Sequence, residues 1–168
     1  VYVAQGHPEL ADEYFRKALQ SSPDDAQVHA EIGYRQYLDG HVPEAIAAYR
    51  KAVELEPGDG NLWVALGGLY MEAGNNAEAA RALDRSIAIE PSYSALTNLG
   101  LLKYQAGDYA GAAALQQQAT QLNPLDFMAW ANLGMALKAD PASAAQARSA
   151  YEQAATRAED YIAAQPND

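Results

Sequence analysis

The sequence has no cysteine, only two phenylalanines and few valines and isoleucines among its 168 residues. Without cysteine there are no disulfides, no thiolate metal sites and no cysteine nucleophile, and this absence fits the cytoplasm and the periplasm alike. The compartment therefore stays open, with the cytoplasm slightly favoured. Alanine and leucine dominate the apolar residues. This favours helices, because alanine loses little entropy in a helix and strands recruit β-branched residues.

Positive charge is also scarce. Eleven Lys and Arg residues face twenty-two Asp and Glu residues, and the formal net charge is −11. Nucleic-acid binding depends on Lys and Arg that neutralise phosphates. Nucleic acid and anionic membranes are therefore disfavoured as direct partners, and the simplest interpretation of the negative charge is solubility.

Long apolar runs are absent as well. No run approaches the ~18–20 apolar residues that a membrane-spanning helix needs, so we expect no direct membrane insertion. No signal-peptide pattern is present. Because the chain begins with Val1 rather than Met, we expect it to be a fragment of a longer array or protein, whose upstream part could hold a targeting signal.

The sequence does contain an internal repeat, which its prolines and glycines make visible. One proline closes each cycle, at spacings of 34, 34 and 33: Pro23, Pro57, Pro91 and Pro124. A glycine precedes each of them by seventeen residues: Gly6, Gly40, Gly74 and Gly107. A third set keeps the register, at spacings of 34, 33 and 34: Gly33, Gly67, Gly100 and Gly134. Three sets of residues in one register over four cycles do not arise by chance.

Each cycle predicts two antiparallel helices joined by a tight turn. Residues 25–39 and 59–73 place apolar groups at helical spacing, and each run ends at a glycine, which suits the left-handed turn after a helix. A second helix follows, as in Pro43–Glu56. It stops before a proline, whose ring disfavours helical geometry in the preceding residue.

The third set of glycines lies in the middle of helices, where glycine costs about 1 kcal/mol relative to alanine. A helix tolerates this cost when a neighbouring helix must approach closely. Small residues of the partner helix have the same effect: Ala11, Ala45, Ala79 and Ala112, with Ala18, Ala52 and Ala119. One helix pair cannot bury its apolar face alone, so we expect successive pairs to stack and share a core.

The spacing and residue classes resemble the tetratricopeptide repeat (TPR) family, whose unit has W-x2-L-G-x2-Y, then A-x3-F, then A and P. Two cycles carry this pattern closely: Trp63-Leu66-Gly67-Tyr70-Ala79-Leu83-Ser86-Pro91 and Trp130-Leu133-Gly134-Leu137. A third carries it more loosely: His29-Ile32-Gly33-Gln36-Ala45-Tyr49-Ala52-Pro57. The resemblance implies an all-α fold, a right-handed α–α superhelix (TPR solenoid) of about four helix-turn-helix repeats with an extended C-terminal capping helix.

We expect a single domain over residues 1–168 that consists of successive repeats. Residues 1–23 form a partial first repeat, in which Val1–Gln5 align with only the end of a first helix. The remaining segments are three full repeats and a last repeat with its capping extension: 24–57, 58–91, 92–124 and 125–168.

The third repeat departs from the pattern. It lacks one residue between Pro91 and Leu99, which should tighten or tilt that join. Lys103 stands at the usual Tyr position. Gln116 stands where the other cycles place an inward-pointing plug: Phe15, Tyr49, Leu83 and Tyr151. The last repeat departs as well: near 138–147, Pro141 and an extra residue replace the glycine turn.

The C-terminal segment predicts one long helix from about Ser143 to Ala164, which we interpret as a cap with a polar outer face. The alternative is that Tyr161 and Ile162 dock on another domain or on a second copy of the chain. Residues 93–168 also resemble the C-terminal TPR arrays of bacterial multidomain signalling proteins, which implies a sensing or docking module.

No catalytic or metal-binding pattern appears. His7 and His41 share a repeat position, and stacked helices lie ~8–10 Å apart, which is wide for two ligands of one metal. His29 falls where Trp63 and Trp130 stand in other repeats, so we expect it to pack. Asp24 and Asp25 lie near a helix start, where they complement the helix dipole. We expect no enzyme activity, no cofactor and no metal site.

The TPR resemblance implies that the first helix of each repeat lines a concave groove. The predicted groove residues are Tyr34, Tyr37, Val64, Gly68, Met71, Glu72, Thr97, Asn98, Leu101, Tyr104, Gln105, Asn132, Met135 and Lys138. Tyr offers apolar area with a hydroxyl, and Met adapts to irregular surfaces. Asn98 and Asn132 could hold a peptide backbone. Each groove tyrosine could instead pack between repeats, whereas we expect the following aromatics in the core: Trp63, Trp130, Tyr49 and Tyr70.

These patterns indicate a non-catalytic protein–protein interaction module that binds a peptide or protein segment in its groove, as scaffold or sensor part of a larger protein. Lys138 stands almost alone in the groove, which disfavours a clamp for a C-terminal carboxylate. An extended or helical peptide with apolar anchors fits better. Two alternatives stay open: a structural unit that forms homo-oligomers through its terminal repeats, and a small-molecule sensor domain.

Overall fold

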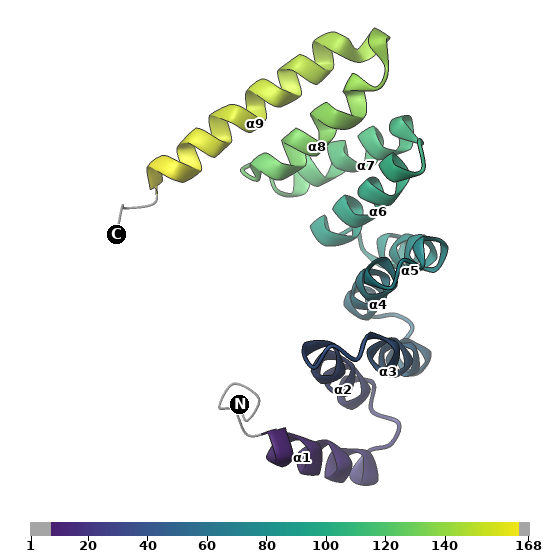
Figure 1. The fold of residues 1–168 in the computed structure, drawn as a ribbon. Coiled ribbons are helices and arrows are strands. Elements are labelled where there is room, and N and C mark those ends of the chain that lie inside the picture. Colours follow the sequence, from purple (N-terminus) through teal and green to yellow (C-terminus); the bar gives the residue numbers. More distant parts are fainter. Residues whose placement is uncertain (1–7, 165–168) are drawn as a thin grey trace. The chain divides into compact units, whose positions relative to one another are not determined.

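The computed structural model describes residues 8–164, with their side chains from residue 13 onward. Every regular element in this range is a helix (Figure 1). The α-helices are α1 (Pro8–Ser21), α2 (Ala26–Leu38), α3 (Val42–Leu55), α4 (Gly60–Glu72), α5 (Asn76–Ile89), α6 (Tyr93–Gln105), α7 (Tyr109–Leu122), α8 (Phe127–Lys138) and α9 (Ala144–Ala164). The predicted all-α fold of helix-turn-helix repeats with a long last helix is confirmed. The predictions for Val1–Gln5 and His7 lie outside the described residues.

The chain divides into two compact units, Val1–Ala82 and Leu83–Asp168, with the division inside α5. In unit 1, α2 packs on α3, and α3 packs on α4. In unit 2, α6 packs on α7, α7 on α8, and α8 on α9. The single domain over 1–168 and its repeat boundaries stay a prediction.

Glycines in the left-handed region close the first helix of three repeats. Gly40, Gly74 and Gly107 have φ angles of 80°, 74° and 82°, which side chains disfavour. The fourth turn has no such glycine. There the 3₁₀ helix η2 (Pro141–Ser143) makes the connection, and the Asp140 carboxylate accepts a hydrogen bond from the backbone N–H of Ala142 at 3.0 Å. The predicted replacement of the glycine turn around Pro141 is confirmed.

The third repeat is one residue shorter because the turn that leads into it is one residue shorter. Residues 22–25, 56–59 and 123–126 form four-residue connections, whereas 90–92 is one residue shorter. In the shorter turn Ser92 is the N-cap of α6, and its side-chain oxygen accepts a hydrogen bond from Ala95 N at 3.2 Å. The longer turns use Asp25, Asp59 and Asp126 as N-caps. The helix of the third repeat thus begins directly at Tyr93, whose hydroxyl donates to Asp126 Oδ2 at 2.5 Å.

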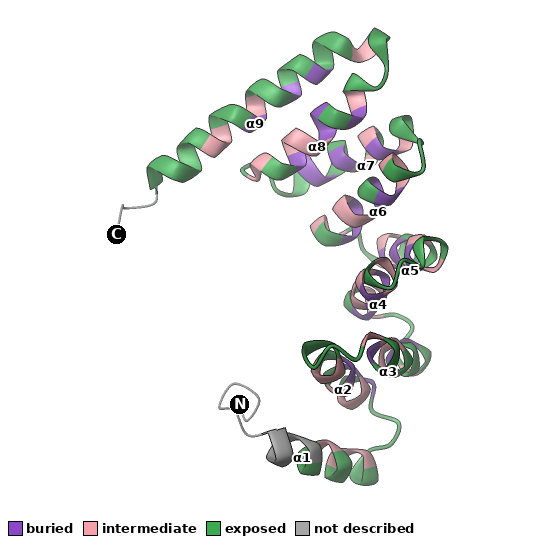
Figure 2. Cartoon of the chain, in the orientation of Figure 1, coloured by how far each residue is buried: buried purple, intermediate pink, exposed green. Residues whose placement is uncertain are grey.

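Figure 2 shows the buried residues in purple along the packed helices. Most of the buried apolar residues are alanine and leucine. Close helix approach explains the alanines: Ala45, Ala52, Ala79, Ala112 and Ala119 are buried, and Ala18 is half-buried. The prediction that four aromatic residues lie in the core needs a partial correction. The residues are only half-buried: Trp63, Trp130, Tyr49 and Tyr70. Three of them pack against the buried cluster of unit 1: Tyr49, Trp63 and Tyr70. Their polar tips keep these rings at the edge of the core.

The close approach predicted for the mid-helix glycines is confirmed at three positions. A Cβ atom on Gly33 would lie 2.6 Å from Cδ2 of Tyr49. A Cβ on Gly134 would lie 2.9 Å from the ring of Tyr151. In the third repeat the same space holds the amide of Gln116, whose Nε2 would lie 2.6 Å from a Cβ on Gly100. At these three positions the plug therefore presses directly on the backbone of the neighbouring helix.

Candidate binding site

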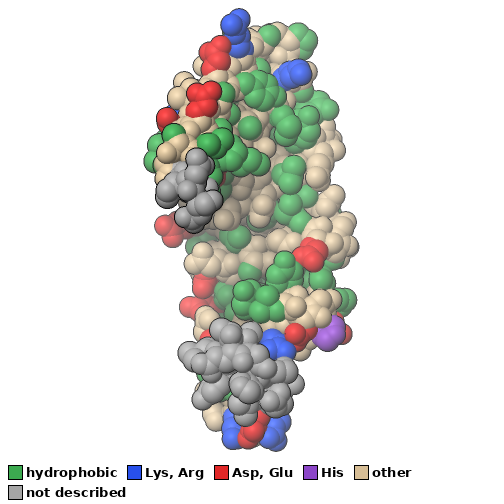
Figure 3. Space-filling model, turned by 60° about the vertical axis from the view of Figure 1, so that its left-hand side comes forward, with side chains coloured by type: hydrophobic (Ala, Val, Ile, Leu, Met, Phe, Trp, Pro, Cys, Tyr) green, Lys and Arg blue, Asp and Glu red, His purple; other side chains and the backbone are tan. Residues whose placement is uncertain are grey.

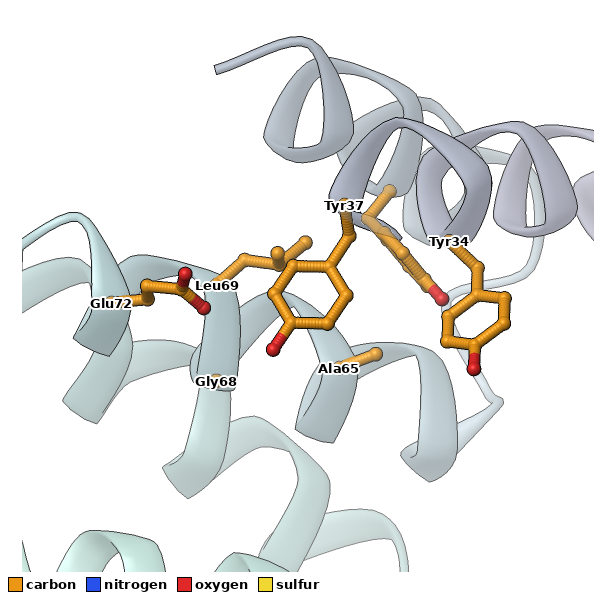
Figure 4. Close-up of a pocket in the computed structure, with 7 residues that line it drawn as sticks. Tyr34, Tyr37, Ala65, Gly68, Leu69 and Glu72 are labelled. Carbon is orange, nitrogen blue, oxygen red and sulfur yellow. The ribbon is translucent and has the colours of Figure 1, made fainter. Parts of the chain in front are cut away.

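Unit 1 contains a pocket of about 260 Å³ between its helices (Figure 4). Its lining comes from three elements: Tyr34 and Tyr37 of α2, Tyr49 of α3, and Ala65, Gly68, Leu69 and Glu72 of α4. The two residues of α2 are three positions apart, and those of α4 follow the i, i+3, i+4, i+7 pattern. Residues at these spacings share one face of a helix. One face of α2 and one face of α4 therefore form the walls of the pocket.

Tyr34 and Tyr37 offer accessible aromatic surface, since they are 55% and 40% exposed. Figure 4 shows both rings reaching from α2 toward α4, with Ala65 and Gly68 opposite them. Tyr49 reaches the same space from α3, where it also packs against Gly33. Tyr49 thus both packs in the core and lines the pocket.

The pocket is mostly apolar, with one charged lining side chain. That side chain is the exposed carboxylate of Glu72 at the end of α4. No lysine or arginine of the described segment lines the pocket. Burial raises the pKa of the Tyr49 hydroxyl, and Tyr34 beside it adds to the rise. Tyr49 therefore stays protonated at neutral pH and can donate a hydrogen bond.

Four of the six groove residues predicted in unit 1 line this pocket: Tyr34, Tyr37, Gly68 and Glu72. Val64 and Met71 are half-buried on α4 and do not line it. The sequence pattern does not predict Tyr49, Ala65 or Leu69 as lining residues, and it places Tyr49 in the core alone. The signal for Ala65 and Leu69 was present, because they stand one helical turn from residues that were predicted.

In unit 2 the predicted groove residues lie on α6 and α8, which contact each other. The five on α6 are Thr97, Asn98, Leu101, Tyr104 and Gln105, and the three on α8 are Asn132, Met135 and Lys138. Hydrophobic side chains reach the surface on the face shown in Figure 3. Leu101 and Met135, each 39% exposed, offer apolar area. All eight stay predicted groove residues.

Two of these side chains are already engaged within unit 2. The Thr97 hydroxyl donates to the Tyr93 carbonyl oxygen at 2.9 Å, and the Tyr104 ring packs edge-on against Tyr109 with centroids 5.3 Å apart. Asn98 and Asn132, by contrast, make no hydrogen bond to other described residues through their side chains. Their amides are therefore available to a partner.

The histidines have structural roles where they are described. His29 Nε2 lies 2.8 Å from the Pro23 carbonyl oxygen, and because a carbonyl only accepts, this nitrogen carries the proton. Trp63 and Trp130 donate through their indole N–H to Pro57 and Pro124 at 3.0 Å in the same way. The ring at this position thus ties α2, α4 and α8 each to the turn before it.

Two other kinds of site are absent from the described part of the chain. No cluster of three or more His, Asp or Glu residues there could hold a metal ion. None of the helices between residues 8 and 164 combines the length and the hydropathy that a membrane span requires.

Comparisons with known proteins identify the repeat. Two models of the tetratricopeptide repeat match the chain, one over residues 36–99 and the other over 1–60 and 97–162. The second alone covers well over half of the sequence. No curated protein matches the sequence significantly.

Several solved structures share the fold. MamA superposes with a TM-score of 0.84 at 20% identity, over 98% of this chain and 90% of that chain. YrrB, described as a TPR protein with an unusual peptide-binding site, superposes with a TM-score of 0.78 at 21% identity, over 85% and 74%. PilF of Pseudomonas aeruginosa gives 0.75 at 23% identity, over 91% and 71%. At these identities the likeness shows the fold alone, which is the α–α superhelix class.

Proposed function

The chain belongs to the tetratricopeptide repeat family, and we propose that it is a non-catalytic protein–protein interaction module. In this role it binds a peptide or protein segment on its first helices, as scaffold or sensor part of a larger protein. The pocket of unit 1 is the observation that supports this function most directly. It combines exposed tyrosine rings, an apolar base and a single carboxylate on the helices that the family resemblance assigns to binding.

The chemistry of these surfaces suits a peptide. Tyrosine is enriched where proteins bind because it supplies contact area at a low entropic cost together with a hydroxyl. The free amides of Asn98 and Asn132 can both donate to and accept from a peptide backbone. A fold neighbour, YrrB, is described as having a peptide-binding site, which is consistent with this use of the fold.

The test uses peptides selected from a random peptide library displayed on phage. We expect Tyr37→Ala combined with Tyr104→Ala, one substitution in each unit, to weaken the selected peptides at least tenfold by calorimetry, since the first removes an exposed ring of the predicted groove and the second a half-buried one. Tyr14→Ala removes an exposed ring on α1, outside the predicted groove, and should leave affinity unchanged. Circular dichroism checks that helicity persists. Unchanged affinity in the double variant, or no selectable peptide, would reject the function.

Self-association is a second candidate, favoured by an apolar end patch on unit 2. This patch consists of Leu122, Leu125, Met128, Tyr161 and Ile162, all exposed. Leu125 and Ile162 are 80% and 71% exposed. The Tyr161 ring lies 6.0 Å from Phe127, which brings the end of α9 to the start of α8. Apolar side chains this exposed favour contact with another protein surface, including a second copy.

The small-molecule sensor is the least supported alternative. Pockets for drug-sized ligands usually have volumes of about 300–1,000 Å³ and enclose most of the ligand. The pocket of unit 1 is smaller, and two of its walls are exposed tyrosines. Its size suits a single side chain of a peptide better than a whole metabolite.

A further inference from the structure

The pocket between α2 and α4 has a chemistry that selects one kind of side chain. Resting on the function proposed above, we propose that this pocket holds the lysine or arginine side chain of a bound peptide. The sequence indicated apolar anchors in general. At this pocket, three features favour a cation: the open space at Gly68, the ring faces of the tyrosines, and the carboxylate of Glu72.

Gly68 keeps the pocket open. It lies in the middle of α4, its φ is not positive, and a Cβ placed on it would meet nothing within 4 Å. Neither backbone geometry nor helix packing therefore requires a glycine here, although glycine weakens a helix relative to alanine. The equivalent positions of the other repeats hold large side chains: Tyr34, Leu101 and Met135. The free space is thus particular to this repeat.

The walls suit a long side chain that is apolar along its length and charged at its tip. Ala65 and Leu69 offer apolar contact for the methylene groups of lysine or arginine. The faces of aromatic rings attract cations, and three tyrosine rings line this pocket. Their hydroxyl oxygens can accept hydrogen bonds from an ammonium or guanidinium group.

The charge of the pocket favours a basic anchor over an acidic or an apolar one. Among the described residues Glu72 is its one carboxylate, so an acidic side chain would be repelled. An apolar side chain would contact the rings but would gain no attraction from Glu72. The nearest cation along α2, Arg35, is paired with Asp39 at 2.7 Å. The net charge of −11 also attracts basic peptides at long range.

The experiment extends the phage selection with synthetic peptides. We expect the selected peptides to share a lysine or arginine at one fixed position. Replacing that residue by norleucine, which keeps the methylene chain and removes the charge, should weaken binding to the wild-type chain about tenfold. Gly68→Met should weaken the lysine peptide by a similar factor because the new side chain fills the space. Its melting temperature should not fall, since methionine favours a helix.

A matched pair of variants separates local charge from net charge. Glu72→Gln should weaken the lysine peptide about fivefold and leave the norleucine peptide unchanged, as expected for an ion pair of this kind. Glu54→Gln removes the same charge from an exposed site on α3, outside the pocket, and should have little effect.

The outcomes distinguish the proposed cationic anchor from the peptide-binding function on which it rests. Equal affinity of lysine and norleucine peptides, equal effects of Glu72→Gln and Glu54→Gln, or selected peptides with no shared basic position would each overturn the cationic anchor. If such peptides still depend on Tyr37 and Tyr104, the peptide-binding function stands without it. If no peptide depends on these tyrosines, both proposals fail.

Discussion

Two mid-helix glycines of unit 1 occupy opposite environments. Gly33 on α2 faces the ring of Tyr49, and a Cβ there would also come within 3.3 Å of the Ala45 carbonyl oxygen. Gly68 on α4 faces open space. The same residue type therefore permits close packing at the first position and leaves a pocket at the second. Only the first glycine is required by the fold.

The two positions give opposite predictions for stability. Gly33→Ala should lower the free energy of unfolding by about 1–3 kcal/mol, because the new methyl group displaces a half-buried ring and a backbone carbonyl limits the adjustment. Gly68→Ala should raise it by up to about 1 kcal/mol, the usual gain in helix propensity. Urea denaturation of both variants measures the difference. Equal effects of the two substitutions would contradict the assigned environments.

Tyr93 is the residue at which the shortened turn has its clearest chemical effect. Burial raises the pKa of its hydroxyl above the ordinary value of about 10, and the hydrogen bond to the Asp126 carboxylate adds to the rise. A folded pKa above the unfolded one means that the stabilisation is fully present below about pH 10 and is lost as the pH rises further.

We therefore expect a stability difference between the wild type and Tyr93→Phe that depends on pH. Near neutral pH the variant should lose about 1.5–3 kcal/mol, the usual contribution of a hydrogen bond to a charged acceptor. Above pH 10 the wild type should lose stability faster than the variant, so the difference shrinks. Urea denaturation between pH 7 and 11 measures it. A difference that stays constant across this range would rule out the role assigned to the Tyr93 hydroxyl.

At the scale of helices, the sequence was sufficient to place most elements. The expected helices 25–39 and Ser143–Ala164 correspond to α2 (Ala26–Leu38) and α9 (Ala144–Ala164). Prolines and glycines determine where the backbone can turn, and this information is local. The sequence does not predict that Tyr49 lines the pocket, because this depends on which side of its ring stays exposed after three helices have packed.

The docking of α9 depends on a contact that the repeat pattern does not contain. Arg157 donates through Nε to the Pro124 carbonyl oxygen, and its guanidinium lies 4.8 Å from the centroid of the Trp130 ring. Its Nη1 also donates to the Gln153 side chain at 2.7 Å. One arginine thus joins the second half of α9 to the turn before α8, 33 residues away in the sequence.

Removing this contact should loosen the second half of α9. Arg157→Ala should lower the free energy of unfolding by about 1–2 kcal/mol, because a cation–π contact and a hydrogen bond are both lost. Amides of residues 155–164 should also exchange with deuterium several-fold faster. Arg148→Ala is the matched control on the same helix, since Arg148 pairs only with Glu152 at the surface and such pairs contribute little. Equal exchange in both variants would contradict the contact.

For the whole molecule, net charge separates the two candidate functions. With a charge of −11, copies of the chain repel one another, and a basic peptide is attracted. Salt screens both effects, with a Debye length of about 8 Å at physiological ionic strength. Added salt should therefore weaken the binding of a cationic peptide and strengthen any association through the apolar end patch.

Sedimentation over a series of protein and salt concentrations tests the self-association candidate. If the end patch is an interface, the average mass should rise with protein concentration, and more steeply at 0.5 M NaCl than at about 0.05 M, because repulsion is screened while apolar burial is not. Leu125→Asp combined with Ile162→Asp should restore the monomer, since both side chains are exposed and their replacement disturbs no core. A chain that stays monomeric throughout excludes this candidate, and peptide binding then stands as the function that the described surfaces favour.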